Sequence, residues 1–425
     1  MKAATSQAKA DLALALFSAG DLEASLRTMD EAIELSRQEH DLTSHARTIG
    51  MKGMILFEAS QFAPAYECFE EVLGLVDESE HSGIKIDALA NIGLVVAATG
   101  DPVTGLEKLQ EALSLARKTN DPPRVMAQLG NIGHTYLQVA NLEEAKKYYT
   151  KALQLARSLD DQKAETGYLN NLGVIYSYMG DHARIIETFE QVLLYAKDLH
   201  DSHIELNALK HLIKAYFEQR KFTSIIRRAP RALELTRQFN DLKKQAFFQE
   251  LLITSLMSTG HYQEAIEEIQ GALDNAEKLS NESLQLNLLG MLADAHYENE
   301  GLEISMQIYQ RALDLSRRLE DQNREARLLG RLAAIAADTG ALEKANAYAE
   351  CSLELGKQLK DYKTVGEQFY ILALNYQELN RMDEAIACCQ QSIEAFMVIN
   401  AQGFVDIAVN LMRNLESTKL SVEAL

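Results

Sequence analysis

The sequence is poor in the residues that usually separate domains. It holds 5 prolines and 22 glycines in 425 residues, although a chain of this length is usually divided into about two to four domains. The scarcity of breaks therefore favours one long helical array. Hydrophobic residues make up 47% of the chain and charged residues 24%, which excludes a disordered or collagen-like protein because enough apolar surface is present to form a core.

Cysteine is also scarce, and its placement argues against two kinds of site. The four cysteines form no Cys-x-x-Cys pair, and Cys388 and Cys389 are adjacent, so that helical geometry would point their side chains apart. We therefore expect neither a disulfide framework nor a zinc site. His200 and His203 flank Asp201, but a loop pair without a further ligand is more typical of solvated histidines than of a metal site.

Positive charge and long hydrophobic runs are lacking too. The chain has 42 basic and 62 acidic residues and a net charge of −20, which disfavours bulk nucleic-acid binding because such proteins neutralise phosphates over a whole face. No apolar run approaches the ~20 residues that span a bilayer. The stretch 12–17 is too short, and lies too close behind Lys9 and Asp11, for a signal sequence. We expect a cytoplasmic protein without membrane insertion.

Catalytic motifs are absent from the sequence. It contains no G-x-S-x-G, no H-E-x-x-H and no Walker-type glycine loop. Scattered carboxylates on a helical array normally face solvent. We therefore predict no enzyme activity, no catalytic residue, no metal and no cofactor.

What the sequence does contain is a repeat of 40 residues. Ten turn segments share one frame without a slip, from Gly20-Asp21 to Asn380-Arg381. Apolar residues recur at i, i+3, i+4 and i+7 over 128–139 and again over 143–158, which predicts two helices in each unit. Such pairs share a continuous core with their neighbours. We predict an all-α array over residues 1–400, followed by a capping helix and short tail at 401–425.

Glycine and aspartate mark the predicted helix ends. Glycine at the turn of several units supplies a left-handed residue without Cβ strain, and Asn380 is the next most tolerant type. An aspartate ahead of the next helix accepts hydrogen bonds from free amides, so we interpret these residues as helix caps and not as metal ligands. They are Asp41, Asp121, Asp161, Asp201, Asp241, Asp321 and Asp361.

The pattern of small and large residues resembles the tetratricopeptide repeat. It is carried by Leu129, Ile132, Gly133, Tyr136, Ala145, Tyr149 and Ala152, and in the following unit by Leu169, Leu172, Gly173, Tyr176 and Phe189. The period of 40 residues, in place of the usual 34, is similar to the repeats of kinesin light chain and of the mitotic-spindle orientation adaptors. The resemblance covers about residues 4–396. It implies a right-handed superhelical solenoid of about ten helix-turn-helix units with a capping helix.

Small residues in the first helix of seven repeats allow close approach of the second helix. They are Gly53, Gly93, Gly133, Gly173, Ala293, Ala333 and Ala373. Tyrosines fill the space beside them, and we expect all four to be core residues. They are Tyr136, Tyr176, Tyr216 and Tyr376.

The resemblance also implies that the first helices line an inner groove and that positions one turn apart on them contact a peptide segment. These positions are Asn91, Asn131, His134, Asn170, Asn171, Tyr178, Asn207, Lys210, His211 and Lys214. Similar asparagines in peptide-binding relatives hold the backbone of an extended partner, and an amide suits this because it both donates and accepts. The alternative is that they only satisfy nearby carbonyls or water. We favour the peptide contact, because asparagine is a poor helix former and three in register have no evident role in stability.

Two further features lie in the middle of the chain. Residues 201–250 hold ten basic and six acidic residues, and this basic island either receives an acidic peptide or a phosphate, or is a solvated outer face. Pro230 lies inside a predicted helix, where it removes a backbone donor and clashes with the preceding turn. We therefore expect a kink or break near Ala229.

The sequence as a whole favours a non-enzymatic adaptor that binds an extended or helical segment of a partner protein. One alternative is a peptide- or effector-responsive sensor, whose output would lie on a separate protein because the repeats occupy nearly the whole chain. Another is self-assembly into a homo-oligomer, since apolar residues of the last half-unit are not all expected to be covered. These residues are Phe404, Ile407, Leu411 and Met412.

Overall fold

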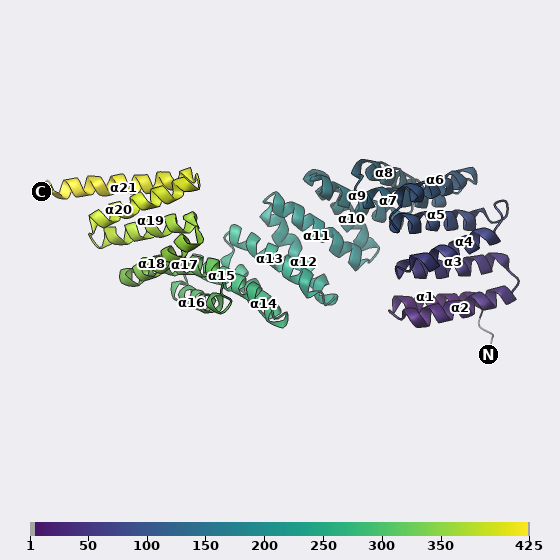
Figure 1. Cartoon of the computed structure of the whole chain (residues 1–425), viewed down its shortest axis with the longest axis horizontal. Coiled ribbons are helices and arrows are strands. Elements are labelled where there is room, and N and C mark those ends of the chain that lie inside the picture. Colours follow the sequence, from purple (N-terminus) through teal and green to yellow (C-terminus); the bar gives the residue numbers. More distant parts are fainter. Residues whose placement is uncertain (1–4, 424–425) are drawn as a thin grey trace. The chain divides into compact units, whose positions relative to one another are not determined.

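The computed structural model describes residues 5–423, which form 21 α-helices and no strand (Figure 1). The chain divides into two compact units between Ala215 and Tyr216. The helices of unit 1 are α1 (Ser6–Ser18), α2 (Leu22–Gln38), α3 (Leu42–Glu58), α4 (Phe62–Leu75), α5 (Ser82–Ala98), α6 (Pro102–Lys118), α7 (Pro122–Gln138), α8 (Leu142–Ser158), α9 (Gln162–Met179) and α10 (His182–Asp198), with most of α11 (Ser202–Glu218). Those of unit 2 are α12 (Phe222–Gln238), α13 (Leu242–Ser258), α14 (Tyr262–Lys278), α15 (Glu282–Glu298), α16 (Leu302–Arg318), α17 (Gln322–Asp338), α18 (Leu342–Leu359), α19 (Tyr362–Glu378), α20 (Met382–Val398) and α21 (Gln402–Glu423).

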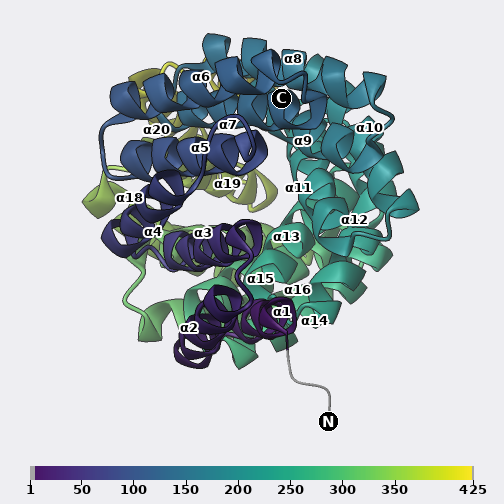
Figure 2. The same ribbon diagram turned by 90° about the vertical axis from the view of Figure 1, so that its right-hand side faces the viewer.

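Within each unit the helices pack in sequence order. Consecutive helices from α1 to α10 contact each other, and so do consecutive helices from α12 to α21. Odd-numbered helices also contact one another, as α3 does with α5, α5 with α7, and α17 with α19. In unit 1, α5, α7 and α9 form an inner layer and α6, α8 and α10 an outer one (Figure 2). The predicted all-α array of helix pairs is therefore confirmed.

Helix ends follow a period of twenty residues. Every twentieth residue from Gly20 to Asn400, apart from Glu80, has a positive φ, which ends one helix before the next begins. The seven predicted aspartate caps are all confirmed, with a carboxylate oxygen 2.9–3.2 Å from a backbone amide nitrogen in the first turn of the following helix. The sequence analysis missed four caps on the second helices of their units, namely Asp21, Asp101, Asn141 and Asp181.

The close approach at the small residues is also confirmed. A Cβ on Gly173 would lie 2.7 Å from the Phe189 ring, and a Cβ on Gly93 would lie 2.8 Å from the carbonyl oxygen of Gly105. Both distances are shorter than van der Waals contact, so the pairs α9–α10 and α5–α6 pack as they do because a side chain is missing there. The buried aromatics Phe189 and Tyr149 come from the second helices of their units.

The prediction that four tyrosines are core residues is wrong for three of them. Tyr216 is buried, whereas Tyr136, Tyr176 and Tyr376 are only half-buried. These three lie near the ends of their helices, as Tyr216 does in α11. Cations cover two of the rings: the Arg184 guanidinium lies 5.4 Å from the Tyr176 ring centre, and a second arginine stacks in the same way on Tyr376.

The expected break at Pro230 is not present. Helix α12 runs without interruption from Phe222 to Gln238, with Pro230 inside it. The proline is on the exposed side of the helix, so the carbonyl group that it deprives of a donor can be hydrated. None of the helices between residues 5 and 423 combines the length and the apolar content needed to cross a membrane.

Candidate functional site

The ten predicted site residues all lie on α5, α7, α9 and α11, which are four of the odd-numbered helices of unit 1. Asn91 is on α5, and Asn131 and His134 are one turn apart on α7. The rest are on α9 and α11, namely Asn170, Asn171 and Tyr178, and Asn207, Lys210, His211 and Lys214. The residues are therefore on one layer of the unit, but their side chains differ in what they contact.

Asn91 lines a pocket of about 250 Å³ between α3 and α5. The pocket has an apolar wall that includes Met51, Met54 and Ile84, and Asp87 lies at its edge. Asn91 is half-buried, and among the residues that the structure describes its amide has no hydrogen-bond partner. An apolar pocket with an unpaired amide at its wall suits a peptide, because the pocket accepts a side chain and the amide can pair with the backbone.

The sequence analysis did not predict this pocket as such. The residues it missed are Met51 and Met54, one turn apart on α3, of which Met54 is exposed. Methionine is common on surfaces that adapt to different partners, because its side chain is flexible and polarisable. The three-residue spacing of the two methionines on the first helix of a repeat was the sequence signal that could have indicated this pocket.

Asn131 and Asn171 share the frame of Asn91 but not its surroundings. The Nδ2 of Asn131 donates to Oε1 of Gln128 at 3.1 Å, and Gln128 is only 2% exposed. Asn131 therefore stabilises a buried glutamine, and the assumption that no asparagine of this series has a role in stability is wrong for it. The Asn171 side chain is half-buried and makes no hydrogen bond within residues 5–423, as for Asn91.

Asn170 and Asn207 are brought together by neighbouring inner helices. The Nδ2 of Asn207 on α11 donates to Oδ1 of Asn170 on α9 at 2.7 Å. This bond uses one donor and one acceptor and leaves the other amide atoms of both residues available. The pair ties the two helices to each other at the layer where the site is predicted.

His211 is held by its own unit. Its ring stacks on Phe189 with the ring centres 4.6 Å apart and the planes 3° from parallel, and Nδ1 lies 3.3 Å from Oγ of Ser177. Burial, together with the charges of Lys210 and Lys214, lowers the pKa of His211 to about 4. The imidazole is therefore neutral at neutral pH and acts as a packing group.

The remaining predicted residues are exposed on the inner helices. Tyr178 is 70% exposed, and His134, Lys210 and Lys214 are exposed as well. Desolvation lowers the pKa of His134 below its usual value, so this ring too is neutral at neutral pH. In the part of the chain that the structure describes, no three His, Cys, Asp or Glu side chains gather as a metal site would require.

Comparison with known families identifies the repeats. Three models of the tetratricopeptide repeat match this chain, over residues 85–158, 169–201 and 369–396. The chain contains tetratricopeptide repeats in these three segments. Such repeats typically build a non-enzymatic fold for protein interaction. No curated protein matches the chain.

One solved structure supports the fold. The apo form of RapI aligns with a TM-score of 0.50 at 12% identity, covering 84% of this chain and 98% of its own. Two further structures align with lower scores. A signal-transduction ATPase with a tetratricopeptide repeat sensor from Pyrococcus horikoshii has a TM-score of 0.48 at 14% identity, over 89% of this chain and 57% of its own. BtubC from P. vanneervenii has a TM-score of 0.38 at 17% identity, over 48% of this chain and 93% of its own.

Proposed function

We propose that this protein is a non-enzymatic scaffold that binds an extended or helical segment of a partner protein along the inner helices of unit 1. The observation that carries the proposal is the apolar pocket between α3 and α5 with the unpaired amide of Asn91 at its wall. Asn171, two 40-residue repeats further along the chain, offers a second amide without a partner among the described residues. Amides at this spacing suit an extended backbone, because each pairs with a peptide unit irrespective of its side chain.

The exposed side chains near these amides supply the proposed selectivity. Lys210 makes no ion pair within the described residues, and it favours a partner segment with a carboxylate at the matching position. His134 and Tyr178 add neutral polar and aromatic contacts. A right-handed superhelix, a cytoplasmic location and the absence of catalysis are part of the same proposal.

The test compares variants of groove residues that do not hold the fold together. Asn91→Ala and Asn171→Ala, combined in one chain, should leave the urea unfolding midpoint unchanged because neither amide has a partner to lose. Partner capture from host lysate should fall at least tenfold. Asn323→Ala, an exposed asparagine of α17, is the matched control and should capture as the wild type does.

Two other results would replace the proposal. Equal capture by the double variant and the control would mean that the inner layer of unit 1 is not the site. A change in the radius of gyration when the captured segment is added would support the sensor alternative, since a rigid scaffold keeps its dimensions. Capture of the protein itself alone would favour self-assembly.

A further inference from the structure

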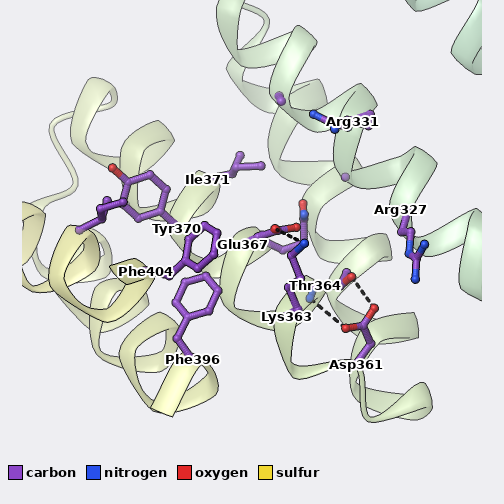
Figure 3. A pocket seen from close by; sticks show the side chains of 14 residues that line it. Arg327, Arg331, Asp361, Lys363, Thr364, Glu367, Tyr370, Ile371, Phe396 and Phe404 are labelled. Atoms are coloured by element: carbon purple, nitrogen blue, oxygen red, sulfur yellow. Dashed lines mark hydrogen bonds and ion pairs between the residues drawn. The ribbon is translucent and has the colours of Figure 1, made fainter. Parts of the chain in front are cut away.

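A second and larger pocket lies in unit 2, about 630 Å³ in volume (Figure 3). Helices α17, α19, α20 and α21 all contribute to its lining. None of the residues predicted from the sequence for the peptide site is part of it. Its walls differ in chemistry, with aromatic residues on one side and arginines on the other, as Figure 3 shows.

The apolar wall is formed by Phe396 and Phe404. Their rings stack with the centres 5.0 Å apart and the planes 20° from parallel, and Phe404 is 44% exposed. Phe396 takes its place against α19 because Gly366 has no side chain: a Cβ there would lie 2.7 Å from the ring. Ile407 continues the wall and is half exposed to solvent. The expectation that the last half-unit leaves apolar residues uncovered is thus confirmed for Phe404 and Ile407, and here they face a pocket.

An unsatisfied amide lies in the same pocket. Gln368 is 3% exposed, and its Oε1 is buried without a hydrogen-bond partner. Its Nε2 also makes no hydrogen bond within residues 5–423. The side chain occupies the space over Gly330, where a Cβ would lie 2.6 Å from Nε2. A buried amide without partners is unfavourable, and a ligand that both donates and accepts removes the deficit. A peptide unit is such a ligand.

One cation of the pocket is unpaired as well. Lys363 pairs with Glu367 at 3.8 Å, and a carboxylate of α15 lies 3.7 Å from Arg331. Asp361 uses its carboxylate on the backbone and hydroxyl of Thr364. Arg327 lines the pocket and makes no ion pair or hydrogen bond in the described part of the chain, although its charge, after the bonds from Thr364, helps to lower the pKa of the neighbouring Asp361 carboxyl. Its planar guanidinium is suited to bidentate binding of a carboxylate.

We propose that this pocket anchors a protein segment that carries an aromatic side chain close to an aspartate or glutamate. The aromatic side chain packs on Phe404 and Ile407, the adjoining peptide bond pairs with Gln368, and the carboxylate binds Arg327. The proposal shares with the proposed function the assumption that the ligand is a peptide, but it concerns a separate site in the other unit. The two can therefore fail independently.

The probes are three acetylated and amidated pentapeptides. The first contains phenylalanine and glutamate, the second phenylalanine and glutamine, and the third alanine and glutamate. Each is titrated into the full chain carrying ¹³C-labelled isoleucine methyl groups. Ile371 and Ile407 report on this pocket, whereas Ile84 reports on the pocket of unit 1. We expect Ile371 and Ile407 to shift, with the first peptide binding at least fivefold more tightly than either of the others.

Two variants make the assignment specific. Arg327→Gln should lower the affinity for the glutamate peptide to that of the glutamine peptide, and leave the latter unchanged. Arg413→Gln is the matched control, because Arg413 is an exposed arginine of unit 2 outside the pocket lining. It should retain the fivefold preference. Gln368→Leu should weaken all three peptides, since each offers the same backbone to the amide.

Several results would overturn the proposal. One is the absence of shifts at Ile371 and Ile407 at millimolar peptide; another is equal affinity for the glutamate and glutamine peptides. Shifts at Ile84 alone would support the site in unit 1 and reject this one, and the reverse pattern would support this one alone. Broadening of Ile407 that depends on protein concentration without peptide would assign the pocket to a second copy of the chain.

Discussion

Tyr168 in unit 1 and Gln368 in unit 2 occupy the same place in their repeats, five 40-residue periods apart. Each covers a glycine of the preceding inner helix: a Cβ on Gly130 would lie 2.7 Å from the Tyr168 ring, and one on Gly330 would lie 2.6 Å from the Gln368 amide. The tyrosine fills this position, and its hydroxyl donates to the carbonyl oxygen of Met126 at 3.1 Å. The glutamine is shorter and has no partner.

The pocket of unit 2 therefore depends on the side chain of residue 368 and not on the backbone. Ala326 in unit 2 occupies the repeat position of Met126. Its carbonyl oxygen accepts a hydrogen bond from Oγ of Ser352 at 2.7 Å. A second comparison within the inner layer leads to the same conclusion. Gln128 is as buried as Gln368, but Asn131 three residues later donates to it, whereas the corresponding residue in unit 2 is Ile371. The Gln128 amide oxygen in unit 1 is satisfied, whereas the Gln368 amide oxygen in unit 2 is not.

Exchanging the two side chains should give the largest effects, with opposite signs. Tyr168→Gln removes a ring packed over Gly130 and loses the bond to Met126, so we expect a loss of about 2–4 kcal/mol in the free energy of unfolding. Gln368→Tyr should instead gain about 1 kcal/mol, because the ring fills the pocket and the unpaired amide is removed. Urea unfolding followed by circular dichroism measures both. If both substitutions destabilise, the two positions are not equivalent.

Truncating asparagines of the inner helices tests whether the hydrogen bond to Gln128 stabilises unit 1. Asn131→Ala leaves the Gln128 amide oxygen buried without a donor, and should cost about 1–3 kcal/mol. Asn171→Ala, in the same frame of the next unit but without a partner to lose, should change stability by less than about 0.5 kcal/mol. The same unfolding measurement applies. Equal effects of the two substitutions would show that the bond to Gln128 does not stabilise the unit.

Substitutions at the turns should change the free energy of unfolding by a smaller amount. Ala140 in unit 1 has φ +57°, and Gly340 in unit 2 ends the corresponding helix with φ +75°. Ala140→Gly should raise the free energy of unfolding by about 0.5–1 kcal/mol, because it removes Cβ strain from a left-handed residue. Gly340→Ala should lower it by about 1 kcal/mol for the same reason. Thermal unfolding of both variants checks the pair, and shifts in the same direction would contradict it.

The period of 40 residues was sufficient to predict the helix pairs, because each turn residue fixes where two helices meet. The seven aspartate caps followed from it directly. The strain at Ala140 did not follow from the residue type, since alanine does not favour a positive φ, although its place in the frame of Gly100 and Gly180 indicated that conformation. The partner of Asn131 was in view three residues away, at a helical spacing, but the sequence does not show that Gln128 is buried.

The pocket of unit 2 could not be predicted from sequence. It depends on what covers Gly330, and that residue is Gln368 on the next inner helix. One polar residue in an apolar stripe carries no visible signal of being unpaired. The amides of Asn91 and Asn171 were found because they repeat in one frame. Their peptide contacts stay a prediction, as does the binding of a carboxylate by Arg327.

The last effect is a dependence on pH that involves His211 in unit 1. Because the folded pKa of His211, about 4, lies below the ordinary value of about 6.5, the unfolded chain binds a proton more readily in the pH range between these values. The stabilising contribution of the neutral ring is complete above pH 6.5 and is lost as the pH falls toward 4. His211→Phe keeps a ring stacked on Phe189 but cannot titrate. Its urea midpoint should therefore fall less than that of the wild type between pH 7 and pH 5, and equal slopes would show that His211 does not carry the effect.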